Sequence, residues 1–456
     1  MLYVLLFLAI FWAAVTGLRY KVSCIHLALV FLSAQLIGTY NIGAPYDLLR
    51  PTFYLGIGLI CIFAGLVLAR TGSVNRPVVP AIRPSASPDL DRRILFCYVS
   101  ITGAFIAYHY LVGGIPLFQE NVLLARFDNT SSGLFGLPGR FNLFGGFFAF
   151  FLVVAYYQIV INHRRLTRLL IAVTLLLLVS RILQGNKGAV VQFMAAVLVV
   201  GPCFARVDTL RESFQRISTG IPRWVLFGSV AAAALAFIGI ATLHISRGIG
   251  IYDDVVHAFV RRVTVISGNA FVEATTSVVR YYGHGYGTYF LNDLAEFAGA
   301  FGMETGFRVT LNQLVSASVT GRDAFGDLFL VPVTMNGLGY LFVEFGLAGI
   351  VIGGVVFGYA MGSLTRASAE TADPLKRAVL FYLQIGLFWI LTRGNLGFYV
   401  PNLLLPLLVF LGIFRIVALL VRTASGRNSI FDVRAGRMLD HPRMDSCQPA
   451  VARTPV

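Results

Sequence analysis

The chain has 456 residues, of which 57% are hydrophobic and only 12% are charged; its formal net charge is +15 and its mean hydropathy is +0.78. A soluble globular protein of this length would need a far larger charged surface, so the composition excludes that class. Many apolar runs reach roughly 20 residues, the length that crosses a bilayer, and they predict an all-α, polytopic integral membrane protein.

Eleven transmembrane helices are predicted along the chain. They fall near residues 2–17, 22–39, 52–69, 94–112, 141–160, 169–183, 189–205, 224–243, 337–359, 377–392 and 401–421. The first run has neither the basic leader nor the small-residue cleavage site of a signal peptide, so we expect it to remain as a span.

The loops of the two sides differ in charge. Lys and Arg are concentrated in the short loops after spans 1, 3, 5, 7 and 9 and in the C-terminal tail. Short basic loops stay in the cytoplasm, so the amino terminus is expected outside and the carboxyl terminus inside. This defines a transmembrane domain, 1–421, with large outer (periplasmic) loops at 113–140 and 244–336. Residues 422–456 form a basic cytoplasmic tail that is either disordered or rests on anionic lipid.

The stretch RILQGNKGAV, residues 181–190, interrupts an apolar run that is long enough for two crossings. Its glycines and asparagine predict a turn, and basic segments on both sides of the run place this turn outside. Two readings of Arg181 and Lys187 remain open. They either snorkel to the lipid headgroups or form a cationic pocket for an anionic ligand.

Three further outer cations lie beside helix ends or in short loops: Arg126, Arg247 and Arg393. Arginine binds phosphate oxygens bidentately, whereas lysine acts as a point charge. If these three gather with Arg181 and Lys187, they would suit a diphosphate.

Other outer features carry weaker signals. YGHGYGTYF, residues 282–290, predicts an ordered loop whose rings either stack on sugars or form a packed lid. Gly354, Gly358 and Gly362 have the spacing that lets membrane helices approach closely. Glu344, near the outer end of the same span, needs a partner, and an outer arginine is the expected one.

No sequence motif indicates a cofactor. Asp89 and Asp91 form a D-x-D, but their short cytoplasmic loop cannot hold a nucleotide-binding domain. Phosphate-loop, dinucleotide and zinc signatures are absent. We therefore expect no cofactor, no metal and no nucleic acid.

Three segments together resemble a known family. GGIPLFQENVLLAR, RILQGNKG and VPVTMNGLGYLFVEFGLAG are similar to segments of the bacterial oligosaccharide repeat unit polymerases, the Wzy-type O-antigen and exopolysaccharide polymerases. Some members have ten residues between an outer arginine and a glycine. This arrangement is absent at the six outer arginines Arg126, Arg181, Arg247, Arg280, Arg308 and Arg322.

The resemblance implies a polytopic, GT-C-like glycosyltransferase of the bacterial inner membrane that works without a metal ion. It would join undecaprenyl-diphosphate-linked repeat units, with membrane lipid around it and a flippase and a chain-length regulator as candidate partners. Diphosphate binding would fall to Arg126, Arg181, Lys187, Arg247 and Arg393. The base that takes the acceptor proton would be His284, Asp293 or Glu344, with His284 preferred narrowly.

Two alternatives remain. An O-antigen ligase, which transfers the finished glycan to lipid A core, needs the same chemistry. A transporter or flippase of lipid-linked glycans would show internal repeats and charge in mid-span. We find no convincing repeat between the halves, and charge in mid-span is nearly absent.

Overall fold

The computed structural model describes residues 24–41, 49–71, 87–119, 141–159, 164–185, 267–299, 309–320, 335–394 and 396–425, with single residues and short pieces elsewhere. Within these ranges every regular element is a helix, which agrees with the predicted all-α class. The elements are α2 (Cys24–Asn41), α3 (Leu49–Thr71), α4 (Pro88–Gly113), η1 (Pro116–Phe118), η3 (Phe141–Gly145), α7 (Gly146–Ile159), α8 (Arg164–Leu183), α13 (Ser267–Glu273), η5 (Ala274–Val278), α14 (Val279–Tyr282), α15 (Thr288–Gly299), α16 (Leu311–Thr320), α17 (Gly337–Glu370), α18 (Pro374–Arg393) and α19 (Leu396–Ala424).

Six helices in the described part are long and apolar enough to cross a membrane. They are Pro51–Ala69, Pro88–Phe118, Leu166–Leu183, Gly337–Glu370, Pro374–Arg393 and Tyr399–Ala424, and each coincides with a predicted span. The predicted spans near 22–39 and 141–160 correspond to α2 and to η3 with α7. Those near 2–17, 189–205 and 224–243 lie wholly or largely outside the described residues. The number eleven and the GT-C-like architecture therefore stay predictions.

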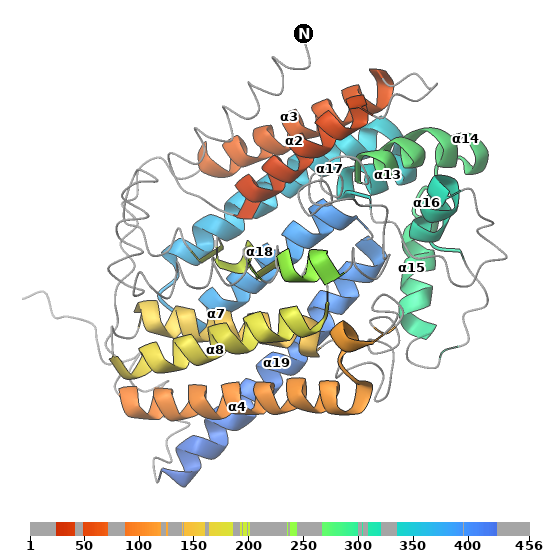
Figure 1. Cartoon of the computed structure of the whole chain (residues 1–456). Helices are drawn as coiled ribbons and strands as arrows, with labels where there is room; N and C mark the ends of the chain where they lie inside the picture. Colours follow the sequence, from red (N-terminus) through yellow and green to blue (C-terminus); the bar gives the residue numbers. More distant parts are fainter. Residues whose placement is uncertain are drawn as a thin grey trace, which may run out of the picture.

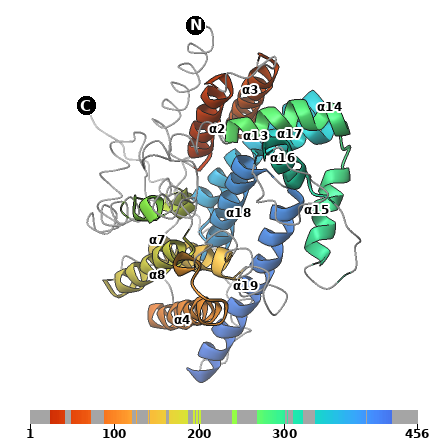
Figure 2. The same ribbon diagram turned by 45° about the vertical axis from the view of Figure 1, so that its right-hand side comes forward.

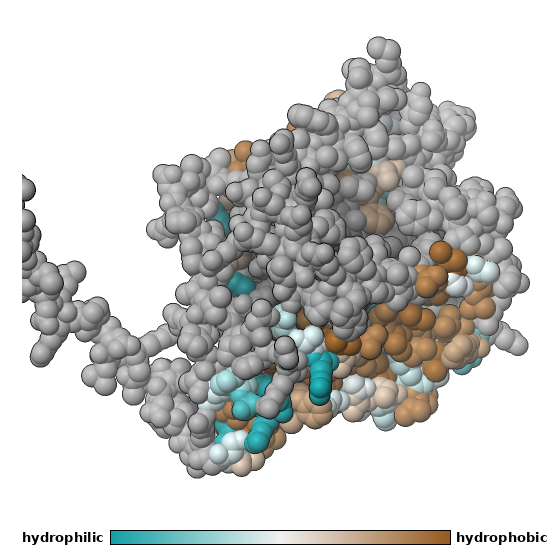
Figure 3. Space-filling view, turned by 60° about the vertical axis from the view of Figure 1, so that its left-hand side comes forward, coloured by the Kyte–Doolittle hydropathy of each residue, from teal (hydrophilic) through white to brown (hydrophobic). Residues whose placement is uncertain are grey.

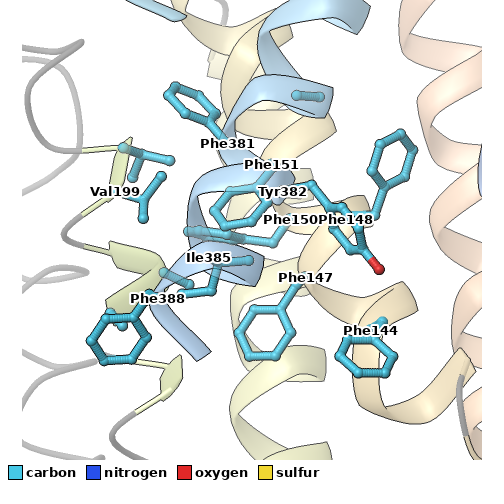
Figure 4. Close-up of a cluster of buried hydrophobic side chains, with 14 of the residues drawn as sticks. Phe144, Phe147, Phe148, Phe150, Phe151, Val199, Phe381, Tyr382, Ile385 and Phe388 are labelled. Atoms are coloured by element: carbon cyan, nitrogen blue, oxygen red, sulfur yellow. The ribbon is translucent and has the colours of Figure 1, made fainter. Parts of the chain in front are cut away.

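The core of the bundle is aromatic and surrounds α7, whose side chains from Phe147 to Ala155 are buried. A helix that is apolar all round packs on every side, as this one does. Phe148 packs edge-on against Tyr382 of α18 and stacks with Phe410 of α19, and Phe151 contacts Phe381 (Figure 4).

Glycine brings α3 and α17 into backbone contact, as the four-residue spacing predicts. A methyl group at Gly358 would collide with the carbonyl of Ile62, and one at Gly65 with that of Val355. The outward sides of these helices are apolar and exposed. Figure 3 shows how, on another face, exposed apolar side chains form a continuous surface with hydrophilic side chains gathered at one end.

Local signals explain how α18 begins and ends. Asp373 accepts hydrogen bonds from the amides of Leu375 (2.9 Å) and Lys376 (3.2 Å), and Pro374 follows it. An aspartate cap followed by proline is a strong start signal. At the other end Gly394 takes a positive φ of 63° and donates its amide to Ile390, which closes the last turn.

α17 consists of two helical pieces that meet at a break. At Gly346 the backbone has φ 64° and ψ −151°, which is not helical. Leu341 consequently lies against Gly349, although an unbroken helix would separate them by about 12 Å. The first piece, residues 337–345, folds back along the second, which corrects the prediction of one continuous span over 337–359.

The described ends of the helices gather in two groups. Tyr110 near the end of α4 donates to the Ser180 carbonyl near the end of α8 (2.5 Å), and Asn336 before α17 donates to Gln35 of α2 (2.7 Å). The segment α13–α16, which belongs to the predicted loop 244–336, covers this end, at the right of Figure 1. At the other end Tyr156 lies within electrostatic range of Asp91, Asp373 and Arg422. The described parts of the loops predicted outside therefore share one end of the bundle.

Candidate functional site

Glu344 ties the first piece of α17 to the start of α15. Its carboxylate accepts the amides of Gly287 (2.7 Å) and Phe290 (2.6 Å), and its side chain is buried. The first amides of a helix have no partner within the helix, and a carboxylate there is also favoured by the helix dipole. The donors found for Glu344 in the described residues are thus backbone amides. Most of the outer arginines expected as its partner lie outside the described residues, so that pairing stays a prediction.

Asp293 lies one turn further along α15, fully buried. Its Oδ2 accepts the hydroxyl of Tyr340 at 2.7 Å, while Oδ1 has no hydrogen-bond partner among the described residues. Burial raises the pKa of Asp293 to about 7; the Tyr340 hydrogen bond opposes this rise, and the charges of Glu296 and Glu344 add to it. A carboxyl group with this pKa can take up or release a proton at neutral pH.

The break at Gly346 frees two carbonyls of α17, and the segment before α15 binds them. Gly285 donates its amide to the Val343 carbonyl (3.0 Å), and Tyr286 donates to that of Glu344 (2.9 Å). No side chain fits at Gly285, because a methyl group there would meet Tyr289 and the Glu344 carboxylate. The glycines of the predicted ordered loop therefore permit a close approach to α17.

His284 belongs to the same attachment and is half-buried. Its Nδ1 lies 3.2 Å from the Val343 carbonyl, and its ring packs edge-on against Phe342 and Tyr286. The contacts found for His284 do not include Asp293, although both residues are held by the first piece of α17. A base at His284 would act from its other ring nitrogen, Nε2.

Arg181 is enclosed by protein, with an exposed fraction of 0%. Its guanidinium donates to the backbone carbonyl of Asn142 and to Gln184, and lies 4.8 Å from the centroid of the Phe147 ring. Snorkelling to the headgroups is therefore wrong for Arg181. The turn predicted after this helix is present as far as Gly185, whose φ is 62°.

Arg393 is half-buried at the last turn of α18. With the Gln192 amide oxygen turned toward α18, that oxygen accepts from both terminal nitrogens of Arg393, at 3.1 and 3.2 Å. Four residues before it, Trp389 packs against Phe147, the ring that faces Arg181. Arg181 is therefore linked through Phe147 to the helix that ends at Arg393.

The first turn of α19, just after Arg393 and the short connection that follows it, lies against Asp293. Gly397 lies against the Cβ of Asp293, and in both ribbon views α15 runs beside α19 (Figures 1 and 2). Asp293 thus lies against the start of α19, just after the short connection that follows Arg393. Arg126, Lys187 and Arg247 lie outside the described residues, so their place relative to this connection stays a prediction.

Tyr340, which donates to Asp293, belongs to the candidate site although the sequence did not indicate it. Its only sequence signal is its spacing of four residues from Glu344, which puts both side chains on one face of a helix. Within the described part of the chain, no three His, Cys, Asp or Glu side chains lie close enough to hold a metal ion.

Comparison of the chain with protein-family models, with curated proteins and with solved structures finds no match.

Proposed function

We propose that this chain is a membrane-embedded glycosyltransferase that extends a polyprenyl-diphosphate-linked glycan, the activity of a repeat unit polymerase. The observation that carries the proposal is the buried pair of Asp293 and Tyr340, in which one carboxylate oxygen is without a partner in the described residues and the pKa is about 7. Glycosyl transfer to a hydroxyl needs a group that accepts a proton near neutral pH.

In this reaction the acceptor hydroxyl attacks the anomeric carbon of the donor glycan. The new carbon–oxygen bond forms, the bond from that carbon to the diphosphate breaks, and the hydroxyl proton passes to Asp293. We favour Asp293 over His284 and Glu344 because the carboxylate of Glu344 is occupied by two amides and Nδ1 of His284 lies at hydrogen-bonding distance from a backbone carbonyl.

Arg393 is our first choice for the group that stabilises the departing diphosphate. It is partly exposed and lies four residues before Gly397, the residue of α19 that packs against Asp293. Arg181 contacts Phe147, which packs against Trp389 of the helix that carries Arg393. Asp293 is shut off from solvent, so in this proposal the acceptor sugar displaces the start of α19 at Gly397 to reach it.

The membrane orientation is part of the same proposal. Basic side chains lie near the end opposite to α13–α16, among them Arg92, Arg93, Arg366, Lys376 and Arg422. The positive-inside rule then puts α13–α16 and the two carboxylates in the periplasm of a bacterium, where a lipid diphosphate donor needs no nucleotide.

The test is deletion of the gene in its bacterial host, with complementation by the wild type or by Asp293→Asn. Loss of the polymerase leaves single repeat units on the surface glycolipid, and the Asn variant fails to restore the ladder while inserting normally. Long chains that accumulate unattached would instead identify a ligase, and a normal ladder would reject both transferase readings.

A further inference from the structure

Three exposed tyrosines lie at the end of α14 and in the segment that links it to α15. Tyr281, Tyr282 and Tyr286, here called the tyrosine patch, are 74%, 50% and 77% exposed. Each ring combines a large apolar body with a polar hydroxyl, so its exposure in water is unfavourable unless a partner of mixed polarity covers it.

The exposed side of α17 shows where the hydrocarbon of the membrane ends. From Leu347 to Tyr359 its exposed side chains are apolar, including Ile352 and Val356. The partly exposed residues up to Leu364 are apolar except Ser363, whose hydroxyl oxygen is buried, and polar residues follow from Thr365. This apolar band is about 27 Å long at 1.5 Å per residue, close to the roughly 30 Å of a bilayer core. The end of the band at Leu347 therefore coincides with the break at Gly346.

The exposed side of α3 gives the same level independently. Its exposed apolar residues begin at Phe53 and continue to Leu68. The neighbouring Tyr54 packs on Phe342 of α17 with ring centroids 4.6 Å apart. Both helices thus put the edge of the lipid-facing surface beside residues 342–346.

The tyrosine patch is attached at this edge. The Tyr286 amide binds the Glu344 carbonyl at 2.9 Å, directly beside Phe345 and Leu347, which are the first exposed apolar residues of the band. Tyr286 also keeps a positive φ of 48°, a conformation that is unfavourable for a residue with a side chain. The attachment therefore holds an exposed aromatic ring at the membrane boundary against backbone strain.

We propose that the tyrosine patch lies in the phospholipid headgroup layer and anchors the start of α15 there. Tyrosine is enriched at this depth because its ring suits the acyl boundary and its hydroxyl suits the headgroups. Continuity with the lipid-facing band favours lipid over a soluble glycan as the partner. The anchor does not depend on the proposed transferase activity; if that activity holds, the anchor keeps Asp293 at the depth of a lipid-linked diphosphate.

The test measures depth by spin labelling. The five native cysteines are replaced by alanine, and one new cysteine is introduced by Tyr286→Cys, by Tyr281→Cys or, as the matched lipid-facing control, by Ile352→Cys. The nitroxide-labelled protein is placed in nanodiscs of phosphatidylethanolamine and phosphatidylglycerol, and its accessibility to oxygen and to a water-soluble nickel chelate is compared with that of a free nitroxide in buffer.

We expect positions 281 and 286 to report a depth between position 352 and the aqueous phase. Accessibility to nickel equal to that of the free nitroxide at both positions would overturn the proposal, and it is also the result expected of a glycan-binding surface. As a second measurement, a benzophenone amino acid replaces Tyr286 in the otherwise native chain. Photolysis then yields a phospholipid adduct by mass, whereas an adduct with glycan alone, or none with lipid, contradicts the anchor.

Discussion

The hydroxyl of Tyr340 donates to Oδ2 of Asp293 across 2.7 Å, between the folded-back piece of α17 and the buried face of α15. This contact joins the two elements that approach the connection between α18 and α19. It stabilises the ionised form of a carboxyl group whose burial favours the protonated form.

The pH dependence of glycan extension follows from this contact. Asp293 acts as a base only when ionised, so activity should rise with pH through about 7. Tyr340→Phe removes a hydrogen bond that lowers the pKa, and the rising limb should therefore move to higher pH. The measurement is kcat/KM against pH, with Asp293→Asn as the control that is inactive throughout. An unchanged limb in the Phe variant would separate Asp293 from the proton transfer.

Replacing Glu344 should move the rising limb of the pH profile in the opposite direction, to lower pH. Its negative charge raises the pKa of Asp293, so Glu344→Gln should shift the limb to lower pH. The variant also weakens the cap of α15, at a cost of about 0.5–2 kcal/mol in unfolding free energy. Glu296→Gln is the matched control, because the charge of exposed Glu296 also raises this pKa without capping the helix. In Glu296→Gln the rising limb of the pH profile should shift to lower pH with no loss of thermal stability. A loss of stability in both variants, or an unshifted pH profile in both, would contradict the assignment.

Gly346→Ala should destabilise the protein by about 1–3 kcal/mol, since its combination of φ and ψ is open almost only to glycine. Gly412→Ala on α19 is the control, because nothing lies within 4 Å of an added methyl group there. That variant should be unchanged or up to about 1 kcal/mol more stable. Thermal unfolding in detergent compares the two, and equal midpoints would mean that α17 is not broken at Gly346.

The two described arginines should respond differently to truncation. Arg393→Ala should abolish extension with little effect on folding, since this side chain is partly exposed. Arg181→Ala should lower stability by about 2–5 kcal/mol, because it opens a cavity and removes the donor to Asn142. Extension assays and unfolding midpoints of both variants test this difference. A fully stable Arg181→Ala protein would return Arg181 to the list of ligand-binding residues.

Hydropathy alone located the six long apolar helices, because a helix that crosses lipid needs an unbroken apolar run. The same run concealed the break in α17. Gly346 stands among apolar residues like the glycines that pack on α3, and nothing in the sequence marks its positive φ. The break nevertheless decides where Glu344 and the segment before α15 meet.

The partners of the charged residues were harder to predict. Charge pairing suggested an arginine for Glu344, whereas the donors found among the described residues are backbone amides 54 to 57 residues away. Their availability depends on where α15 begins. Arg181 was placed near the surface by its position in the apolar run, whereas its burial depends on Phe147 and Asn142, which belong to another helix. Contacts of this kind follow from packing, which local sequence patterns do not encode.

The most direct test of the central claim is extension of a lipid-linked repeat unit by the purified protein in nanodiscs. Undecaprenyl-diphosphate-linked units from the host are incubated with the wild type and with Asp293→Asn, and products are resolved by length. The account predicts a ladder of chains for the wild type, with activity that falls below about pH 7, and only single units for a folded Asn variant. A full ladder from Asp293→Asn, or no ladder from a correctly folded wild type, would contradict it.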